Sequence, residues 1–168
     1  ALLLATGLIA VAVSSLGTAW ALRHARRHGL IDMPDVRRSH RLATPRGGGI
    51  GIVLACLGCL VVMAVQDGGN PRWWLVAGGL TLVAGIGWLD DHRPLPALPR
   101  LAVHVLSALL VALALHFGGA GELACLAGFV LVFGLVHAWN FMNGFNGLAA
   151  IRAMLFGGAF FFLPGFPS

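Results

Sequence analysis

Long runs without a charged residue are the feature that most limits how this chain can fold. Five such runs are long enough to cross a bilayer as helices, the lower edge being about 17 residues, namely residues 2–22, 47–66, 73–89, 101–117 and 123–139. A sixth apolar run, near residues 149–163, is shorter and stops at Pro164. None of the runs has the polar face of a buried helix in a soluble protein. The sequence therefore predicts an all-α, polytopic integral membrane protein with about five or six transmembrane helices.

The composition agrees with a lipid environment. Hydrophobic residues make up 58% of the 168 residues and charged residues only 10%, whereas a soluble domain carries about 25% charged residues. Such a chain cannot cover itself with a water-facing shell. The basic residues are all arginines that lie between apolar runs and not along one face, so we expect a lipid bilayer and no nucleic acid as partner.

The arginines also predict which side of the membrane each loop faces. Seven lie in residues 23–46, and Arg93, Arg100 and Arg152 lie in later alternate loops, whereas only Arg72 lies in the opposite set. By the positive-inside rule, the arginine-rich loops face the cytoplasm and the N-terminus faces outside. The longest connecting segment, residues 23–46, is too short to fold alone. We therefore expect residues 1–168 to form a single membrane domain.

Two features of the predicted cytoplasmic loops could bind a phosphate and a cation. Arg46 and three glycines, residues 47–49, precede the second apolar run. Glycines at a helix start let backbone N–H groups approach an anion, and Arg46 adds a full positive charge. The alternative is a flexible turn, with Gly47 and Gly51 spaced for close helix packing. Asp90 and Asp91 follow the third run and have the ligand type that Mg²⁺ prefers, or they are solvated acids near the next helix start.

A third loop is rich in amides. Asn140, Asn143 and Asn146, with two glycines, interrupt an apolar stretch that could have continued. Polar groups at membrane depth must be satisfied and so usually line a site, although Asn-Gly is also a strong turn signal. Cys56, Cys59 and Cys125 lie in apolar runs without a matching ligand cluster, and we interpret them as packing residues.

These three loops together resemble one known family. The segments S-H-R-L-A-T-P-R-G-G-G (39–49), L-D-D-H-R-P-L (89–95) and N-F-M-N-G-F-N-G-L-A (140–149) are similar, in order, to the motifs of the polyprenyl-phosphate N-acetylhexosamine-1-phosphate transferases. That family includes the phospho-N-acetylmuramoyl-pentapeptide transferase and bacterial enzymes that start O-antigen and other surface glycans. The T-P-R-G-G-G form resembles the surface-glycan branch more closely. The resemblance extends from about residue 23 to residue 148.

The resemblance implies a reaction, a location and a set of residues. A polyprenyl (undecaprenyl) phosphate attacks a UDP-N-acetylhexosamine, UMP leaves, and a lipid-linked sugar diphosphate starts a cell-envelope glycan. The expected location is the bacterial inner (cytoplasmic) membrane, and a homodimer is one option for the assembly. The expected cofactor is Mg²⁺, with Mn²⁺ as a substitute, held by Asp90 and Asp91, which are also the expected catalytic residues. The expected substrate-binding residues are Thr44, Arg46, Gly47, Gly48, Asn140, Asn143 and Asn146.

Two departures from the family pattern leave a second function open for this chain. The family's third motif reads N-x-x-D-G-x-D-G, whereas Asn143 and Asn146 stand at both Asp positions here. An amide supplies neither a negative charge nor a base. Family members also continue with further spans and loops, so the chain is expected to be the N-terminal part of a longer transferase fold. The alternative is a catalytically inactive membrane homologue that binds lipid phosphate or nucleotide, or that assembles with an active partner.

Overall fold

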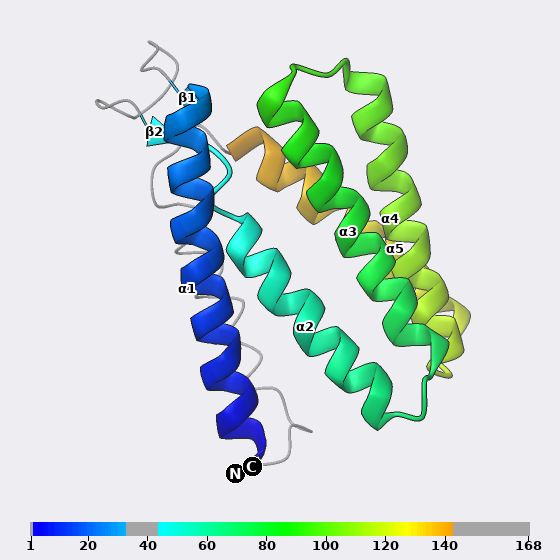
Figure 1. Cartoon of the computed structure of the whole chain (residues 1–168). Helices are drawn as coiled ribbons and strands as arrows, with labels where there is room; N and C mark the ends of the chain where they lie inside the picture. Colours follow the sequence, from blue (N-terminus) through cyan, green and yellow to red (C-terminus); the bar gives the residue numbers. More distant parts are fainter. Residues whose placement is uncertain (1, 33–43, 143–168) are drawn as a thin grey trace.

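The chain folds into a series of membrane-length helices. The computed structural model describes residues 2–32 and 44–142 (Figure 1), and its five helices are α1 (Leu2–His28), α2 (Ile50–Gln66), α3 (Pro71–His92), α4 (Ala97–Phe117) and α5 (Glu122–Met142). Two short strands, β1 (Ile31–Asp32) and β2 (Thr44–Pro45), pair antiparallel between α1 and α2. The prediction of an all-α polytopic membrane protein is confirmed. The sixth apolar run, near residues 149–163, lies outside the described residues.

Three helices are long and apolar enough to cross a membrane by themselves. These are the segment Ala5–His28 of α1, the whole of α3 and the whole of α4. Helix α2, with 17 residues, and the segment Glu122–His137 of α5 are shorter apolar helices. The five helices correspond one to one with the five runs expected from the sequence.

The helix ends differ from the expected ones, because helices tolerate charge in their last turns. Helix α1 continues to His28 and carries Arg26 and Arg27 there, where cations interact favourably with the helix dipole. Helix α3 continues to His92, so Asp90 and Asp91 stand on a helix and not in a loop as predicted. Helix α2 begins only at Ile50, which leaves the three glycines as a turn before it.

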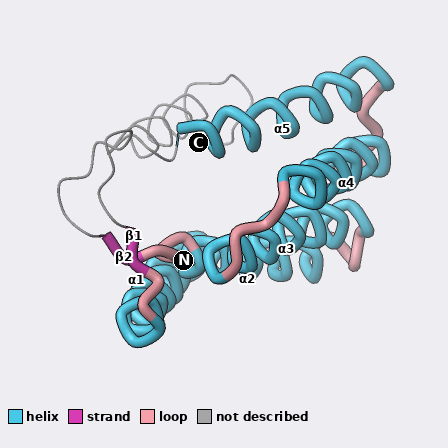
Figure 2. The backbone as a smooth tube through the Cα atoms, turned by 90° about the horizontal axis from the view of Figure 1, so that it is seen from above, coloured by secondary structure: helices cyan, strands magenta, loops and turns pink. Residues whose placement is uncertain are grey.

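Each helix packs against the next one in the sequence. Figure 2 shows α1 to α4 following one another as a curved row, with α5 set to one side next to α4. The buried residues of the described chain are mostly small, whereas large apolar side chains such as Leu8, Leu98 and Leu123 are exposed. Small residues inside and large apolar residues outside are typical of helices that pack together in lipid. Cys56 and Cys59 are also exposed in the described part of the chain and carry free thiols.

Glycines bring α1 and α2 into backbone contact. A Cβ added at Gly17 would lie 2.7 Å from the Cα of Gly51, and a Cβ at Gly51 would overlap the carbonyl oxygen of Ser14. No side chain fits between the two helices at this point. The packing role that the sequence offered for Gly51 is therefore observed, and it fixes where α2 begins relative to α1.

The turn between α2 and α3 is held by local polar contacts. The carboxylate of Asp67 pairs with Arg72 (2.7 Å between Oδ2 and Nη2) and accepts a hydrogen bond from the indole Nε1 of Trp73 at 2.9 Å. The Arg72 guanidinium carbon also lies 4.7 Å from the centre of the Trp73 ring. Asn70 caps α3 by accepting a hydrogen bond from the backbone N–H of Arg72 at 3.1 Å.

Candidate functional site

The start of α2 is built for an anion. Gly47 has a positive φ of 82°, a conformation that residues with a side chain rarely adopt. The carbonyl of Gly48 accepts a hydrogen bond from the Thr18 hydroxyl of α1 at 3.2 Å, which ties the glycine turn to α1. Gly49 stands at the N-cap, and no side chain in the described part of the chain caps the helix there. The backbone N–H of Ile50 donates to the carbonyl of Gly47 at 3.2 Å. The partial positive charge of the helix start still favours a negatively charged group there.

The β1–β2 pair fixes Arg46 next to this turn. Thr44 pairs with Asp32, and Pro45 pairs with Ile31. The backbone N–H of Arg46 then donates to the carbonyl of Leu30 at 2.9 Å. The strand pair therefore carries the chain from the end of α1 to the start of α2, and it sets Arg46 directly before the glycines.

Asp91, on α3, lines a cavity beside the glycine turn that precedes α2. This cavity, of about 180 Å³, lies between the start of α2 and α3. It is lined by Gly47, Gly49, Ile50, Val53, Ala84, Gly87, Trp88 and Asp91. The half-buried Asp91 carboxylate is close enough to Arg46 for the two charges to interact. Two of the three motifs found in the sequence thus meet at one hollow. Its volume is below the roughly 300–1,000 Å³ of pockets for drug-sized ligands.

Asp90 has different surroundings. One of its carboxylate oxygens accepts a hydrogen bond from the backbone N–H of Leu95 at 2.8 Å. The other oxygen lies 3.2 Å from the Nη1 of Arg100, at the start of α4. Asp90 therefore ties the α3–α4 turn to α4, and Asp91 is the carboxylate that lines the cavity.

The donor set at the cavity fits magnesium in one common binding mode. Mg²⁺ keeps several waters and is often bound by one or two carboxylates together with substrate phosphates. Asp91 supplies such a carboxylate beside a helix N-terminus that suits phosphate. Across residues 2–32 and 44–142, no three His, Cys, Asp or Glu side chains gather as a ready-made metal site. A metal here would thus depend on oxygen atoms of the substrate.

Only some of the remaining predicted substrate-binding residues lie in the described part of the chain. Thr44 stands in β2, and Asn140 stands in the last turn of α5, which ends at the same end of the bundle as α1 and α3 (Figure 1). Asn143 and Asn146 lie outside the described residues. The expected meeting of the amide-rich loop with the cavity therefore stays a prediction.

Sequence reasoning missed two residues that build the site. The Trp88 ring forms one wall of the cavity, 3.5 Å from where a Cβ of Gly47 would stand. The Thr18 hydroxyl, which holds Gly48, stands in the middle of an apolar run. Trp88 could have been noticed because it lies three positions before Asp91 and thus on the same face of a helix. Nothing in the sequence marks Thr18.

Comparison with known proteins agrees with the motifs. The model of the family described as glycosyl transferase family 4 matches residues 73–165, more than half of the chain. A decaprenyl-phosphate N-acetylglucosaminephosphotransferase of Mycolicibacterium smegmatis is 31% identical over 167 residues, which cover 86% of this chain and 40% of that relative. The proteins of the same name from Mycobacterium tuberculosis H37Rv and Mycobacterium leprae are each 28% identical over 165 residues, covering 86% of this chain and 41% of theirs.

The chain thus spans about two-fifths of the length of these curated relatives. No solved structure matches it significantly.

Proposed function

Because this chain belongs to glycosyl transferase family 4, we propose that it provides the phosphate-binding part of an enzyme that transfers N-acetylhexosamine 1-phosphate to a polyprenyl phosphate. The donor is a UDP-N-acetylhexosamine, and the product starts a lipid-linked glycan of the cell envelope. The names of the relatives support this proposal, since they specify a decaprenyl phosphate and an N-acetylglucosamine phosphate. The same names do not favour the inactive homologue.

One observation carries the proposal, namely the cavity in which Asp91 faces the start of α2. Arg46 and the helix N-terminus attract a phosphate, because both are positive. Asp91 alone would repel the same phosphate. A cation between the carboxylate and the phosphate would offset their repulsion in such a small hollow, and phosphoryl transfer uses this arrangement.

In the proposed reaction, an oxygen of the polyprenyl phosphate bonds to the β-phosphorus of the UDP-sugar, and the bond from that phosphorus to UMP breaks. The side chain of Asp91 would hold Mg²⁺, which when bound offsets the negative charge of the phosphates. Arg46 and the N–H groups at the start of α2 orient one phosphate. Asp90 keeps the end of α3 in position through Leu95 and Arg100. We assign the metal-holding role to Asp91 and a positioning role to Asp90.

The proposed location is the bacterial inner membrane, in multi-pass form, with the cavity facing the cytoplasm. Of the arginines in described segments, Arg72 alone lies at the opposite end from the cavity. This bias supports a cytoplasmic cavity. Single cysteines at Pro96 and Ala120, in a chain without Cys56, Cys59 and Cys125, test it. An impermeant maleimide added to intact cells should label position 120 and leave position 96 unlabelled, and the reverse pattern contradicts the orientation.

A test of activity needs a longer protein, because the chain spans about two-fifths of the length of its relatives. We suggest joining the chain to the C-terminal part of the Mycolicibacterium smegmatis relative and measuring UMP release from UDP-N-acetylglucosamine in membranes supplied with decaprenyl phosphate. The 168-residue chain by itself is expected to show no turnover, because Asn143 and Asn146 stand where the family has carboxylates. The joined protein should become active, or markedly more active, when Asn143→Asp and Asn146→Asp are introduced together, because these changes restore the family's carboxylates.

The outcomes of this test separate the hypotheses. UMP release that depends on Asp91 supports the transferase proposal, whether or not the two Asn residues must be changed. Equal release with Asn and with Asp would mean that the amides suffice. Absence of release in both versions, from a joined protein that inserts and folds, would contradict the proposal and favour the inactive homologue. Mass spectrometry must accompany the assay, because Asn-Gly sequences can deamidate to Asp.

A further inference from the structure

A second polar cluster, at the same end of the bundle as the cavity, has no role in the proposed transfer. It consists of histidines on α1 and α3. His24 and His28 stand one helical turn apart on α1, with ring centres 4.2 Å apart, and the His24 ring centre lies 5.6 Å from that of His92 on α3. Helices α1 and α3 are not neighbours in the sequence of helices, so these long side chains bridge between them.

The distance between two of the ring nitrogens is the informative quantity. The Nε2 atoms of His24 and His92 lie 3.3 Å apart. Two imidazole nitrogens bound at about 2.0–2.1 Å to one tetrahedral ion are separated by about 3.3–3.4 Å. The pair therefore has the spacing of two ligands of one metal ion. The same distance also fits a hydrogen bond in which one imidazole N–H donates to the other ring nitrogen, and the experiment below separates the two interpretations.

A second contact sets the chemical form of His92. Its Nδ1 lies 2.8 Å from the backbone carbonyl of Trp88. A carbonyl can only accept a hydrogen bond, so Nδ1 carries the proton, and the neutral ring then presents a bare lone pair at Nε2. Metal-binding histidines in proteins usually donate their other ring N–H in this way to a carbonyl or carboxylate. The lone pair of His92 faces His24.

Tryptophans hold the two histidines in this geometry. Trp20 stacks on Trp88 with ring centres 6.1 Å apart, and the same Trp20 ring stacks on His24 at 5.3 Å. The Trp88 ring in turn contacts His92 at 4.6 Å. The side chains of the pair are thus supported by neighbouring rings before any ion binds, which reduces the ordering that binding requires.

We propose that His24 and His92 form a two-histidine binding site for a divalent transition-metal ion such as Zn²⁺, which would link α1 to α3. Imidazole nitrogen suits Zn²⁺, whereas Mg²⁺ prefers oxygen ligands, so the site is distinct in chemistry from the carboxylate of Asp91. The proposal needs only two protein ligands, with water completing the coordination. It does not depend on the proposed transferase activity.

The test uses the purified 168-residue chain in detergent, carrying an affinity tag without histidine. Co²⁺ is the first probe, because a four-coordinate Co²⁺ site absorbs visible light far more strongly than aqueous Co²⁺. Zn²⁺ should remove this absorption by competition, and it should raise the melting temperature, because it binds only the folded state. The variants His24→Gln and His92→Gln keep a polar side chain but lose the imidazole. Each should weaken Zn²⁺ binding about tenfold or more.

The matched control is His116→Gln. His116 is an exposed histidine at the opposite end of α4 and should bind no ion of this kind, so its variant should keep the affinity of the parent. Circular dichroism shows whether each variant retains its helices. The proposal is overturned if the parent lacks the Co²⁺ absorption, as it would if the two histidines only share a hydrogen bond. It is also overturned if folded His24→Gln and His92→Gln variants bind Zn²⁺ as the parent does.

Discussion

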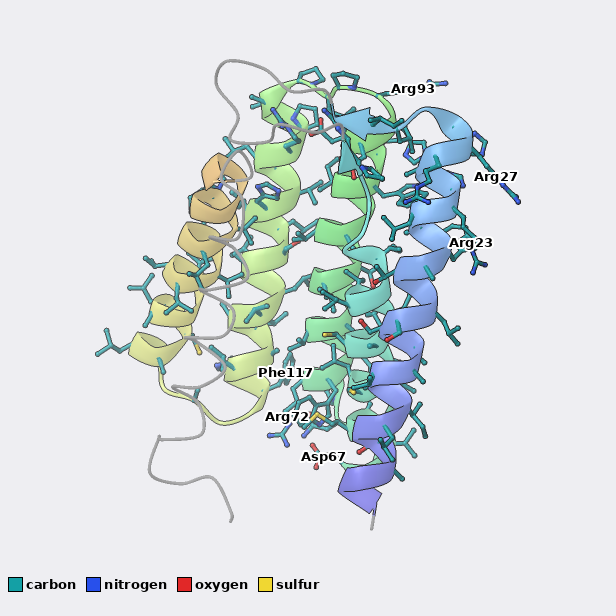
Figure 3. The ribbon with its side chains drawn as sticks, turned by 90° about the vertical axis from the view of Figure 1, so that its left-hand side faces the viewer. Arg23, Arg27, Asp67, Arg72, Arg93 and Phe117 are labelled. Atoms are coloured by element: carbon teal, nitrogen blue, oxygen red, sulfur yellow. The ribbon has the colours of Figure 1, made fainter. Side chains whose placement is uncertain are left out.

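The two ends of the bundle use the same three residue types for opposite purposes. Figure 3 labels Asp67 and Arg72 at one end, and Arg23, Arg27 and Arg93 toward the other. At the first end, an Asp, an Arg and a Trp lie within one turn of the chain and satisfy one another. At the second end, Trp88 and Asp91 of α3 line a cavity, and Arg46, from the segment before α2, is close enough to interact with the Asp91 charge.

The difference shows what makes a polar cluster structural or functional. Asp67 is engaged by both Arg72 and the Trp73 indole, at 2.7 and 2.9 Å, and this engagement closes the α2–α3 turn. Asp91 lines a hollow beside an uncapped helix N-terminus, where a ligand can complete the arrangement. A local cluster forms as the chain turns, whereas a cluster assembled from distant segments depends on how those segments pack together.

The largest effect should come from a change of Asp91. Asp91→Asn removes the negative charge at the cavity, so it should abolish most of the Mn²⁺ relaxation enhancement of the purified chain. In the joined protein it should also lower turnover about a hundredfold or more. Asp67→Asn, the same change at the other end, should leave both quantities as they are. Equal loss in the two variants would remove the functional distinction between the ends.

A second effect concerns the packing that holds the cavity in place. Gly51→Val inserts a side chain where α1 and α2 touch, and we expect it to lower the free energy of unfolding by about 1–3 kcal/mol. Gly58→Val is the matched control on the same helix, because a Cβ at Gly58 meets nothing within 4 Å. Thermal unfolding in detergent measures both variants. Equal melting temperatures would show that the backbone contact at Gly51 contributes no stability.

A smaller effect is expected within the glycine turn itself. Gly47→Ala places a side chain on a residue with φ of 82°, which should cost about 1–2 kcal/mol. The same variant should weaken binding of a polyprenyl phosphate analogue, because the turn before α2 shifts. Gly48→Ala is the control, since a Cβ at Gly48 meets nothing within 4 Å and its φ is not positive. If both variants bind the analogue as the parent does, the turn is only a connection.

The smallest effect should come from the Asp67 contacts. The Asp67 and Arg72 side chains are 38% and 36% exposed, so solvent weakens their attraction. Asp67→Ala should therefore lower the free energy of unfolding by only about 0.2–1 kcal/mol. Thermal unfolding and Mn²⁺ binding should be measured on the same sample. Changed Mn²⁺ binding in Asp67→Ala would show that the two ends of the bundle are coupled.

Much of the fold was predictable because lipid imposes a simple rule. A run of apolar residues without charge has to become a helix in the membrane, since every backbone N–H and C=O must be bonded within the segment. All five predicted runs in the described chain are helices. The error at Asp90 and Asp91 was one of boundaries, because a carboxylate at the end of a membrane helix can reach water without ending the helix.

The sequence by itself determined that the chain spans a membrane, and it identified the glycine turn and the acid pair as the segments to consider. Only the tertiary structure decided which aspartate lines the cavity. Adjacent residues on a helix point about 100° apart, so Asp90 and Asp91 face different neighbours. Those neighbours depend on how α2 and α4 pack against α3. The same holds for His24 and His92, whose meeting requires α1 and α3 to be brought together by packing that no local pattern encodes.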